Sequence, residues 1–462
     1  MQNIEKVFVL GLDCMTPQLA FEQWIDDLPT FKRLMTEGVW GRMRSVIPAI
    51  TVPAWMCMMT SKDPGRLGIY GFRNRKNYSY DEMFYANALA FKEPTVWDYL
   101  SRANKRSIVI GVPGTYPTKP INGNMISCFM TPDTSVDFTY PKTLKQELID
   151  HGIHYILDTD EFRTNDKDRL LKELYQMTDE RMKTVHYLLD NREWDFFVAV
   201  EMGPDRIHHG FWSYMATDHP KYVPGNPYEN AIHDYYKAID REMARIIDRL
   251  DDRTAFLVVS DHGAKTMDGG ICVNDWLKKE GYLTLKESPK SPTRFKTSMV
   301  DWSKTKAWSS GGYYGRLFLN VQGREPAGII PPEDYEEVRT ELKEKIEAIP
   351  NHKGGPIGTK VFRPEDIYKI INNVAPDLLI YFGDLDWRSV GTVGNPEIWT
   401  FENDTGPDDA NHAQEGIFGA IGSGISGGKQ MTDISIMDMA PTMLSLLGRP
   451  VPEDMQGKVL EL

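Results

Sequence analysis

Six side chains suited to metal binding stand beside short apolar runs that lie far apart in the chain. The runs cover residues 7–12, 196–200, 255–260 and 416–421. The carboxylates and imidazoles beside them are Asp13, Asp205, His209, Asp261, His262 and His412. Because the carboxyl ends of strands in an open α/β sheet meet at one crevice, we expect these side chains to converge. Three carboxylates and three imidazoles suit a site for two metal ions.

Asp205 and His209 are four residues apart, so on a helix they share one face and can bind one ion. His208 is the rival ligand at the third position, and only one of the two histidines should point inward. The alternative is a polar helix start that Asp205 caps. Turns and helix caps also explain Asp13, Asp261 and His412 taken singly. Taken jointly, the six residues favour a metal site because together they complete two ligand sets.

Thr51 supplies a hydroxyl group within residues 47–55, just before an expected helix. A plain helix cap is one interpretation. The other is a nucleophile, because a helix start carries free N–H groups and the positive end of the dipole, which together stabilise an oxyanion. A bound metal ion lowers the pKa of such a hydroxyl.

Apolar runs separated by amphipathic segments predict the elements that position these residues. Further strands are expected at 108–112 and 378–383, and helices at 20–38 and 230–252. This alternation indicates an α/β fold with a central, mostly parallel sheet flanked by helices. We expect residues 1–462 to form one catalytic domain, because the ligands span the chain. The alternation breaks at 130–190 and 284–365, which are candidate inserted cap segments.

Composition narrows the class of protein. The net charge of −13 disfavours nucleic-acid binding, although two divalent ions would reverse the local sign at a phosphate site. The cysteines, Cys14, Cys57, Cys128 and Cys272, are widely spaced and predict free thiols in a reducing compartment. No segment reaches the roughly 20 apolar residues of a membrane-spanning helix. We expect a cytoplasmic protein that acts on a small molecule without membrane attachment.

Several motifs together resemble the alkaline phosphatase superfamily. They are Gly11-Leu-Asp13, residues 47–55, residues 64–72, Asp205-Arg-Ile-His-His209, Ser260-Asp-His-Gly263, His412 and residues 436–443. In this order they are most similar to type I phosphodiesterases and nucleotide pyrophosphatases and their phosphohydrolase and phosphomutase-like relatives. The resemblance spans the chain and implies an alkaline phosphatase-like layered fold.

The resemblance also implies a division of roles. One metal ion would be bound by Asp205, His209 and His412, and the other by Asp13, Asp261 and His262 with Thr51. Thr51 would attack phosphorus and form a phospho-threonine intermediate, which water then hydrolyses. Zinc fits the mixed ligands, and manganese is the alternative.

The sequence indicates less about the substrate than about the metal ligands. Relatives that cleave nucleotides carry an asparagine where this chain has Phe72, which disfavours a nucleotide diester. The candidate substrate contacts are Arg73, Asn74, Tyr314 and Arg316, with Arg75 and Lys265 as further cations near phosphate. The expected activity is phosphodiesterase or phosphomonoesterase. A phosphomutase and a non-catalytic metal-stabilised binding protein are the alternatives.

Overall fold

The computed structural model describes residues 4–425 and 427–462, and its core is a large twisted sheet. The strands lie in the order β22-β2-β21-β9-β1-β8-β5-β6-β7, and β23 also pairs with β2. Their bounds are β1 (Lys6–Leu12), β2 (Val39–Arg44), β5 (Ser107–Ile110), β6 (Gly123–Ile126), β7 (Thr139–Tyr140), β8 (Phe196–Glu201), β9 (Thr254–Val259), β21 (Glu415–Ile421), β22 (Lys429–Gln430) and β23 (Ile434–Ser435).

Most neighbouring strands in this sheet are parallel, as the sequence predicted. β1 lies between β8 and β9, is parallel to both, and is buried along almost its whole length. β21 is the exception in the middle of the sheet, since it runs antiparallel to β9 and to β2. Its amino end therefore lies at the same edge as the carboxyl ends of the parallel strands. This reversal brings the residues before β21 to the crevice.

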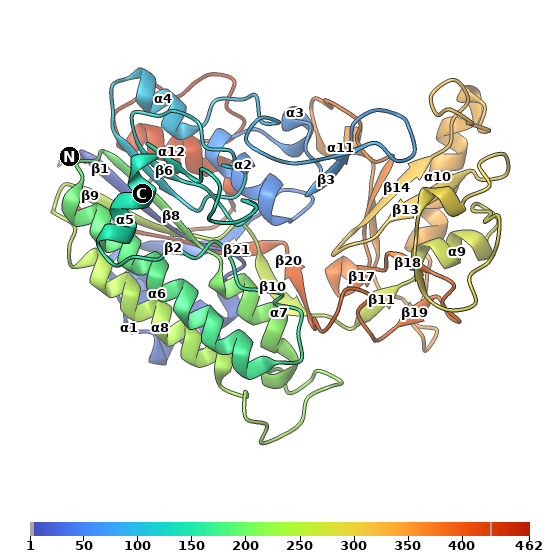
Figure 1. The fold of residues 1–462 in the computed structure, drawn as a ribbon, viewed down its shortest axis with the longest axis horizontal. Coiled ribbons are helices and arrows are strands. Elements are labelled where there is room, and N and C mark those ends of the chain that lie inside the picture. The colour runs from blue at the N-terminus through green and yellow to red at the C-terminus, as the bar shows by residue number, and fades with distance from the viewer. Residues whose placement is uncertain (1–3, 426) are drawn as a thin grey trace.

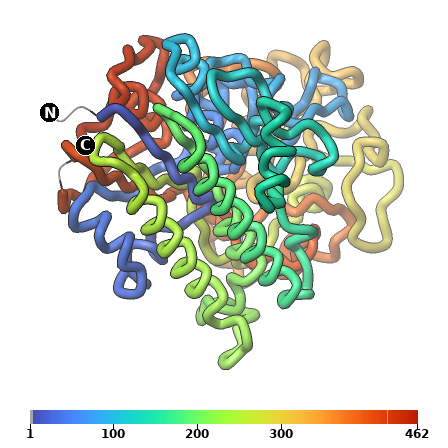
Figure 2. Tube along the Cα trace, turned by 60° about the vertical axis from the view of Figure 1, so that its left-hand side comes forward, coloured from blue at the N-terminus to red at the C-terminus, as the bar shows by residue number. Residues whose placement is uncertain are grey.

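Helices cover both faces of the sheet (Figure 1). On one face lie α1 (Pro29–Glu37), α6 (Lys167–Asn191), α7 (Gly203–Met215) and α8 (Ala231–Ile247). On the other lie α2 (Thr51–Thr60), α4 (Val96–Arg102) and α12 (Met439–Leu446). α5 (Thr143–Asp150) packs beside β7. In Figure 2 the long α6 and α8 run side by side, which places much of the 130–190 segment in this helical layer.

A second body lies beyond the carboxyl edge of the sheet and has its own hydrophobic core (Figure 1). Its antiparallel sheet has the order β13-β14-β16-β15, and α9 and α10 pack with it. The bounds are β13 (Ala307–Ser310), β14 (Gly315–Leu319), β15 (Lys360–Phe362), β16 (Leu378–Tyr381), α9 (Val273–Lys279) and α10 (Tyr335–Glu347). The strand expected at 378–383 exists, but it belongs to this sheet, because burial on both faces marks a strand without identifying its partners.

Smaller elements lie between the two bodies or within them. They are α3 (Pro64–Leu67), α11 (Pro364–Ile367), β3 (Arg73–Arg75), β4 (Met83–Tyr85), β10 (Gly263–Thr266), β11 (Gly269–Ile271), β12 (Thr293–Arg294), β17 (Trp387–Ser389), β18 (Thr392–Val393), β19 (Trp399–Thr400) and β20 (Ala410–Ala413). A buried cluster rich in tyrosine, including Tyr70, Tyr368 and Tyr381, lies where they meet.

One helix prediction was wrong in detail. Residues 20–38 do not form a single helix: a π-helical turn at Gln18–Gln23 and a 3₁₀ turn at Ile25–Asp27 precede α1. Leu28 leaves the helical conformation because it precedes Pro29, whose ring disfavours helical geometry at the residue before it. The helix expected at 230–252 is confirmed as α8, which ends at Ile247.

Candidate metal centre

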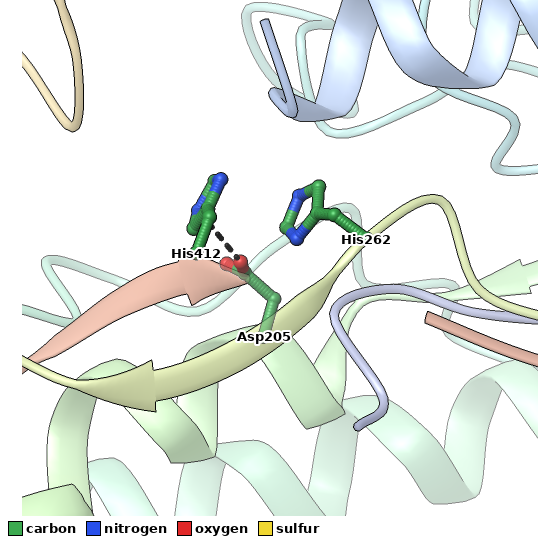
Figure 3. A group of neighbouring side chains, drawn as sticks. All are labelled: Asp205, His262 and His412. Atoms are coloured by element: carbon green, nitrogen blue, oxygen red, sulfur yellow. Dashed lines mark ion pairs between the residues drawn. The ribbon is translucent and has the colours of Figure 1, made fainter. Parts of the chain in front are cut away.

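The fold brings the predicted ligands and Thr51 to one edge of the central sheet. Asp13 follows β1, and Asp261 and His262 follow β9. Asp205 and His209 lie on α7, directly after β8, whereas His412 lies on β20, where it pairs with Ala264 of β10. Thr51 is the first residue of α2. Figure 3 shows Asp205, His262 and His412 pointing toward one another from a helix, a strand end and β20.

Asp205, His209 and His412 form what we call the first cluster. The Nε2 atom of His209 lies 3.3 Å from Asp205 Oδ1 and 3.3 Å from His412 Nε2. His412 Nε2 lies 3.8 Å from the same Asp205 oxygen. Atoms bound to one zinc ion at about 2.0–2.1 Å lie roughly this far apart, so the three donors suit a single ion.

Asp13, Asp261 and His262 form the second cluster. His262 Nε2 lies 3.1 Å from Asp261 Oδ2 and 3.9 Å from Asp13 Oδ1. One ligand atom from each of these residues lies within 4.8 Å of the others, and the same holds for His262 with Asp205 and His412. We assign His262 to the second cluster because its distances to Asp261 and Asp13 complete that set, and His209 completes the first.

Thr51 adjoins the second cluster. Its hydroxyl Oγ1 lies 3.4 Å from His262 Nε2, and the residue is only 3% exposed. Ile50, which precedes it, is extended and provides no side-chain cap to α2. The N–H groups in the first turn of a helix have no acceptors within the helix, so they are available to an oxyanion.

Each of these carboxylates and imidazoles has two polar atoms. One is held by a contact with a neighbouring group outside the cluster, and the other points into the cluster. In the second cluster, Asp13 Oδ2 accepts from Trp55 Nε1 at 2.6 Å, and Asp261 Oδ1 accepts from the backbone of Cys14 at 3.2 Å. His262 Nδ1 lies 3.1 Å from the carbonyl of Gly263. Such contacts orient metal ligands and select the histidine tautomer.

The first cluster has the same construction. Asp205 Oδ2 accepts from Arg206, His209 Nδ1 lies 2.8 Å from Asp408 Oδ1, and His412 Nδ1 lies 2.9 Å from the carbonyl of Ala49. All three Nε2 atoms of the two clusters therefore face the interior as acceptors when Nδ1 carries the proton.

The inward carboxylate oxygens have no hydrogen-bond partner, although they are buried. These orphaned atoms are Asp13 Oδ1, Asp205 Oδ1 and Asp261 Oδ2. A buried carboxylate oxygen without a partner is costly, and a divalent cation removes that cost. The three atoms belong to the two clusters, so the residues present fit a pair of metal ions.

The pKa shifts indicate the same crowding of negative charge. Burial raises the pKa of Asp13 well above its usual value, and the charges of Asp261 and Asp205 raise it further. Burial also raises the pKa of Asp261. For His209, burial lowers the pKa, but Asp408 and Asp205 outweigh it and raise it to about 9. The field that retains a proton at His209 also attracts a metal cation.

His208 points away from the two clusters. Its Nε2 lies 2.9 Å from the hydroxyl of Tyr236 on α8. Burial lowers the pKa of His208 to about 3, so its imidazole is neutral. Of the two adjacent histidines, His209 therefore faces the first cluster.

The candidate substrate contacts mostly bind the protein's own backbone. Asn74 accepts from the N–H of Tyr70 at 2.7 Å and donates to the carbonyl of Gly71 at 2.9 Å. Tyr314 donates to the carbonyl of Tyr70, and Arg316 donates to the carbonyl of Arg73. These bonds fasten the segment from Tyr70 to Arg73 onto β14.

The two further cations are paired elsewhere. Arg75 forms a buried ion pair with Glu325 at 3.2 Å and packs against rings of the second body. Lys265 pairs with Asp386. Neither places its charge on an inward atom of the clusters.

Sequence reasoning missed several residues that touch the clusters. Trp55 and Asp408 bond directly to ligands, and the ring of Tyr313 stacks on His412 with centroids 4.3 Å apart. Asp408 lies just before β20, which carries His412, and Tyr313 lies in the glycine- and tyrosine-rich stretch beside Tyr314. Such positions give a weak signal, since only packing selects one tyrosine over its neighbour.

Among the helices that the structure describes, none is long and apolar enough to cross a membrane.

A mostly parallel sheet with carboxylate and imidazole clusters at its carboxyl edge, flanked by helices, is the architecture of the alkaline phosphatase superfamily of phosphohydrolases. The family model for type I phosphodiesterase/nucleotide pyrophosphatase matches residues 7–408, so the chain belongs to this family. That match ends before His412. A search of curated proteins found no match.

Solved structures share this fold at low sequence identity. Murine ectonucleotide pyrophosphatase/phosphodiesterase 5, in an inactive form with AMP, is 15% identical, with 97% of each chain covered and a TM-score of 0.56. Phosphonoacetate hydrolase from Sinorhizobium meliloti, in complex with phosphonoformate, is 14% identical, with 96% of each chain covered and a TM-score of 0.61. Such identities show the fold alone. The family supports a phosphohydrolase of the phosphodiesterase or pyrophosphatase class.

Proposed function

We propose that this protein hydrolyses a small phosphoester with Thr51 as its nucleophile and two divalent ions, zinc or manganese, in the two clusters. The observation that carries the proposal is the set of three orphaned carboxylate oxygens and three inward Nε2 atoms, with the Thr51 hydroxyl 3.4 Å from one of them. Two ions bound by these atoms would stabilise the negative charge on the attacking oxygen and on the leaving oxygen.

In the proposed reaction, Thr51 Oγ1 attacks phosphorus and loses its proton to solvent. The bond from phosphorus to the leaving-group oxygen breaks, a phospho-threonine forms, and the leaving group takes up a proton from solvent and departs as an alcohol. Water then attacks phosphorus, the bond to Oγ1 breaks, and the hydroxyl is restored. The first-turn N–H groups of α2 would stabilise the phosphoryl oxygens. Ions bound at the clusters would supply Lewis-acid polarisation and a lowered hydroxyl pKa.

A phosphomutase is the second candidate, because one observation favours it. Each of the six ligands is at most 2% exposed and Thr51 is 3% exposed, and a mutase needs a site that excludes water. A mutase would return the phosphoryl group from Thr51 to a bound substrate. Release of inorganic phosphate or of a leaving alcohol into solution distinguishes hydrolysis from transfer.

The test uses p-nitrophenyl phosphate and bis(p-nitrophenyl) phosphate. The chelator-treated protein should be inactive and should release p-nitrophenol after Zn²⁺ or Mn²⁺ is added. Thr51→Ala should lose at least about 1,000-fold in kcat while it still binds metal. Acid quenching followed by mass spectrometry should find phosphate on Thr51. Near-normal turnover by Thr51→Ala would refute the assignment.

We also propose that the protein works in the cytoplasm on a small-molecule substrate. The cysteines, Cys14, Cys57, Cys128 and Cys272, are all free and buried, which suits a reducing compartment. Zinc is favoured over manganese because half of the ligands are imidazoles. The segment 284–365 contributes Tyr313 to the metal centre, which supports its role as a cap.

A further inference from the structure

Asp408 is a buried carboxylate that connects one metal ligand to two distant segments. Its Oδ1 lies 2.8 Å from Nδ1 of His209. Its Oδ2 accepts from Arg163 Nε at 2.8 Å and from the hydroxyl of Tyr313 at 3.0 Å. The carboxylate is fully buried. Its negative charge is balanced by ion pairs with Arg163 and with His209.

Tyr313 also contacts the ligands directly. Its ring stacks on His209 with centroids 4.8 Å apart and planes 16° apart, and on His412 at 4.3 Å and 29°. Arg163 donates to the same hydroxyl that donates to Asp408. Tyr313 lies between β13 and β14 of the second body, whereas Arg163 lies between α5 and α6. Three segments far apart in sequence therefore meet on one side of the first cluster.

No hydrogen bond described for the ligands of the second cluster reaches Asp408 or Tyr313, although the ring of His262 stacks on that of His412 with centroids 3.8 Å apart. The outer partners of the second cluster are the indole of Trp55 and the backbone of Cys14 and Gly263, all within the body built on the large sheet. The two clusters therefore depend on different parts of the molecule. A change at Asp408 reaches the first cluster through His209, and a change at Tyr313 reaches it through His209 and His412.

We propose that Asp408 is a positioning residue for His209, and that Tyr313 and Arg163 hold it so that the second body completes the first metal site. This inference rests on the proposed function, because it requires that both clusters bind ions. The chemical reason is that a histidine whose Nδ1–H donates to a carboxylate has its tautomer and ring orientation fixed and its Nε2 made more basic.

The experiment measures the affinity of each ion separately. The purified full chain is titrated with Zn²⁺ in competition with a chromogenic chelator. The wild type should bind two ions. Asp408→Asn should weaken the affinity for one ion by about 10–100-fold and leave the affinity for the other unchanged. Tyr313→Phe keeps the stacked ring and loses only the hydroxyl, so it should weaken the same ion by a smaller factor.

Two matched controls test for general damage. Asp409→Asn removes the neighbouring carboxylate, which pairs with Lys221 at 2.9 Å. Tyr335→Phe removes a hydroxyl that donates to Asp377 at 2.7 Å, and Arg324 pairs with that carboxylate as Arg163 does with Asp408. Both controls should keep the two wild-type affinities.

The outcomes distinguish the proposed two-metal function from the proposed role of Asp408. A wild type that binds fewer than two ions overturns the proposed function and this inference with it. If the wild type binds two ions and Tyr313→Phe and Asp408→Asn keep both affinities, only the inference fails. Equal weakening of the binding of both ions would also overturn it, because among the ligands the contacts described for Asp408 and Tyr313 reach only His209 and His412, which belong to the first cluster. If Asp408→Asn does not fold, Tyr313→Phe decides.

Discussion

Metal removal should lower the stability of the folded protein, and Asp13→Asn should make the metal-free protein more stable than the metal-free wild type. Three buried carboxylates meet at the clusters, and Arg206 pairs with one of them, Asp205. Without metal ions, Asp13 and Asp261 face each other's charge in a medium that solvates it poorly. Asparagine at position 13 removes one charge and keeps an oxygen that can accept the Trp55 indole N–H at 2.6 Å.

The expected size follows from binding linkage. An ion present at 100 times its Kd stabilises the folded state by about 2.7 kcal/mol, so two ions contribute about 5 kcal/mol. The unfolding entropy of a chain of 462 residues is about 1 kcal/mol per degree, so the melting temperature should fall by about 5 °C in chelator. Asp13→Asn should keep only about half of the metal-induced shift, because it weakens the second cluster alone.

The assay is thermal denaturation followed by circular dichroism, in chelator and in excess Zn²⁺. In chelator the Asp13→Asn variant should melt above the wild type, and in Zn²⁺ below it. This reversal of order is the decisive result, since a plain structural defect lowers both temperatures. The reasoning is wrong if the variant melts below the wild type in chelator, or if it retains the full metal-induced shift.

Three further predictions follow from the site. Thr51→Ser should keep part of the activity, with kcat reduced by about 10-fold, because serine retains the hydroxyl but lacks the methyl group that restricts its rotamer; steady-state kinetics would contradict this if the variant were as inactive as Thr51→Ala. His209→Ala should lose one of two bound ions in elemental analysis, whereas His208→Ala should keep both and lose about 1–3 kcal/mol of stability with its Tyr236 contact; the reverse ranking would exclude the assigned helix face. Arg316→Met should free the segment that ends at Arg73 and change the ratio of kcat/KM between mono- and diester substrates more than it changes metal content; an unchanged substrate profile would make that contact purely structural.

The sequence was informative about most of the predicted ligands because a local rule places them, whereas His412 reaches the crevice only because β21 runs antiparallel to its neighbours. A short apolar run predicts a buried strand, and a polar residue directly after it lies at the sheet's carboxyl edge. This reasoning predicted that Asp13 and Asp261 lie at that edge, where the structure has them, and the four-residue spacing from Asp205 favoured His209 over His208. The family match confirms the resemblance, while the roles of the ligands and of Thr51 stay predictions.

Tertiary structure alone decided which residues surround those ligands. Tyr313 and Tyr314 are adjacent and chemically identical, yet one stacks on His209 and the other bonds to the backbone of Tyr70. The apolar pattern of the strand expected at 378–383 does not indicate which distant strand it pairs with. Only the structure shows that it pairs with β14 in the second sheet. Residue type and position relative to each apolar run thus predicted the candidate donors, because both are properties of a short local stretch of sequence. Packing between elements determined their outer partners, because such contacts depend on where the whole chain brings distant segments together.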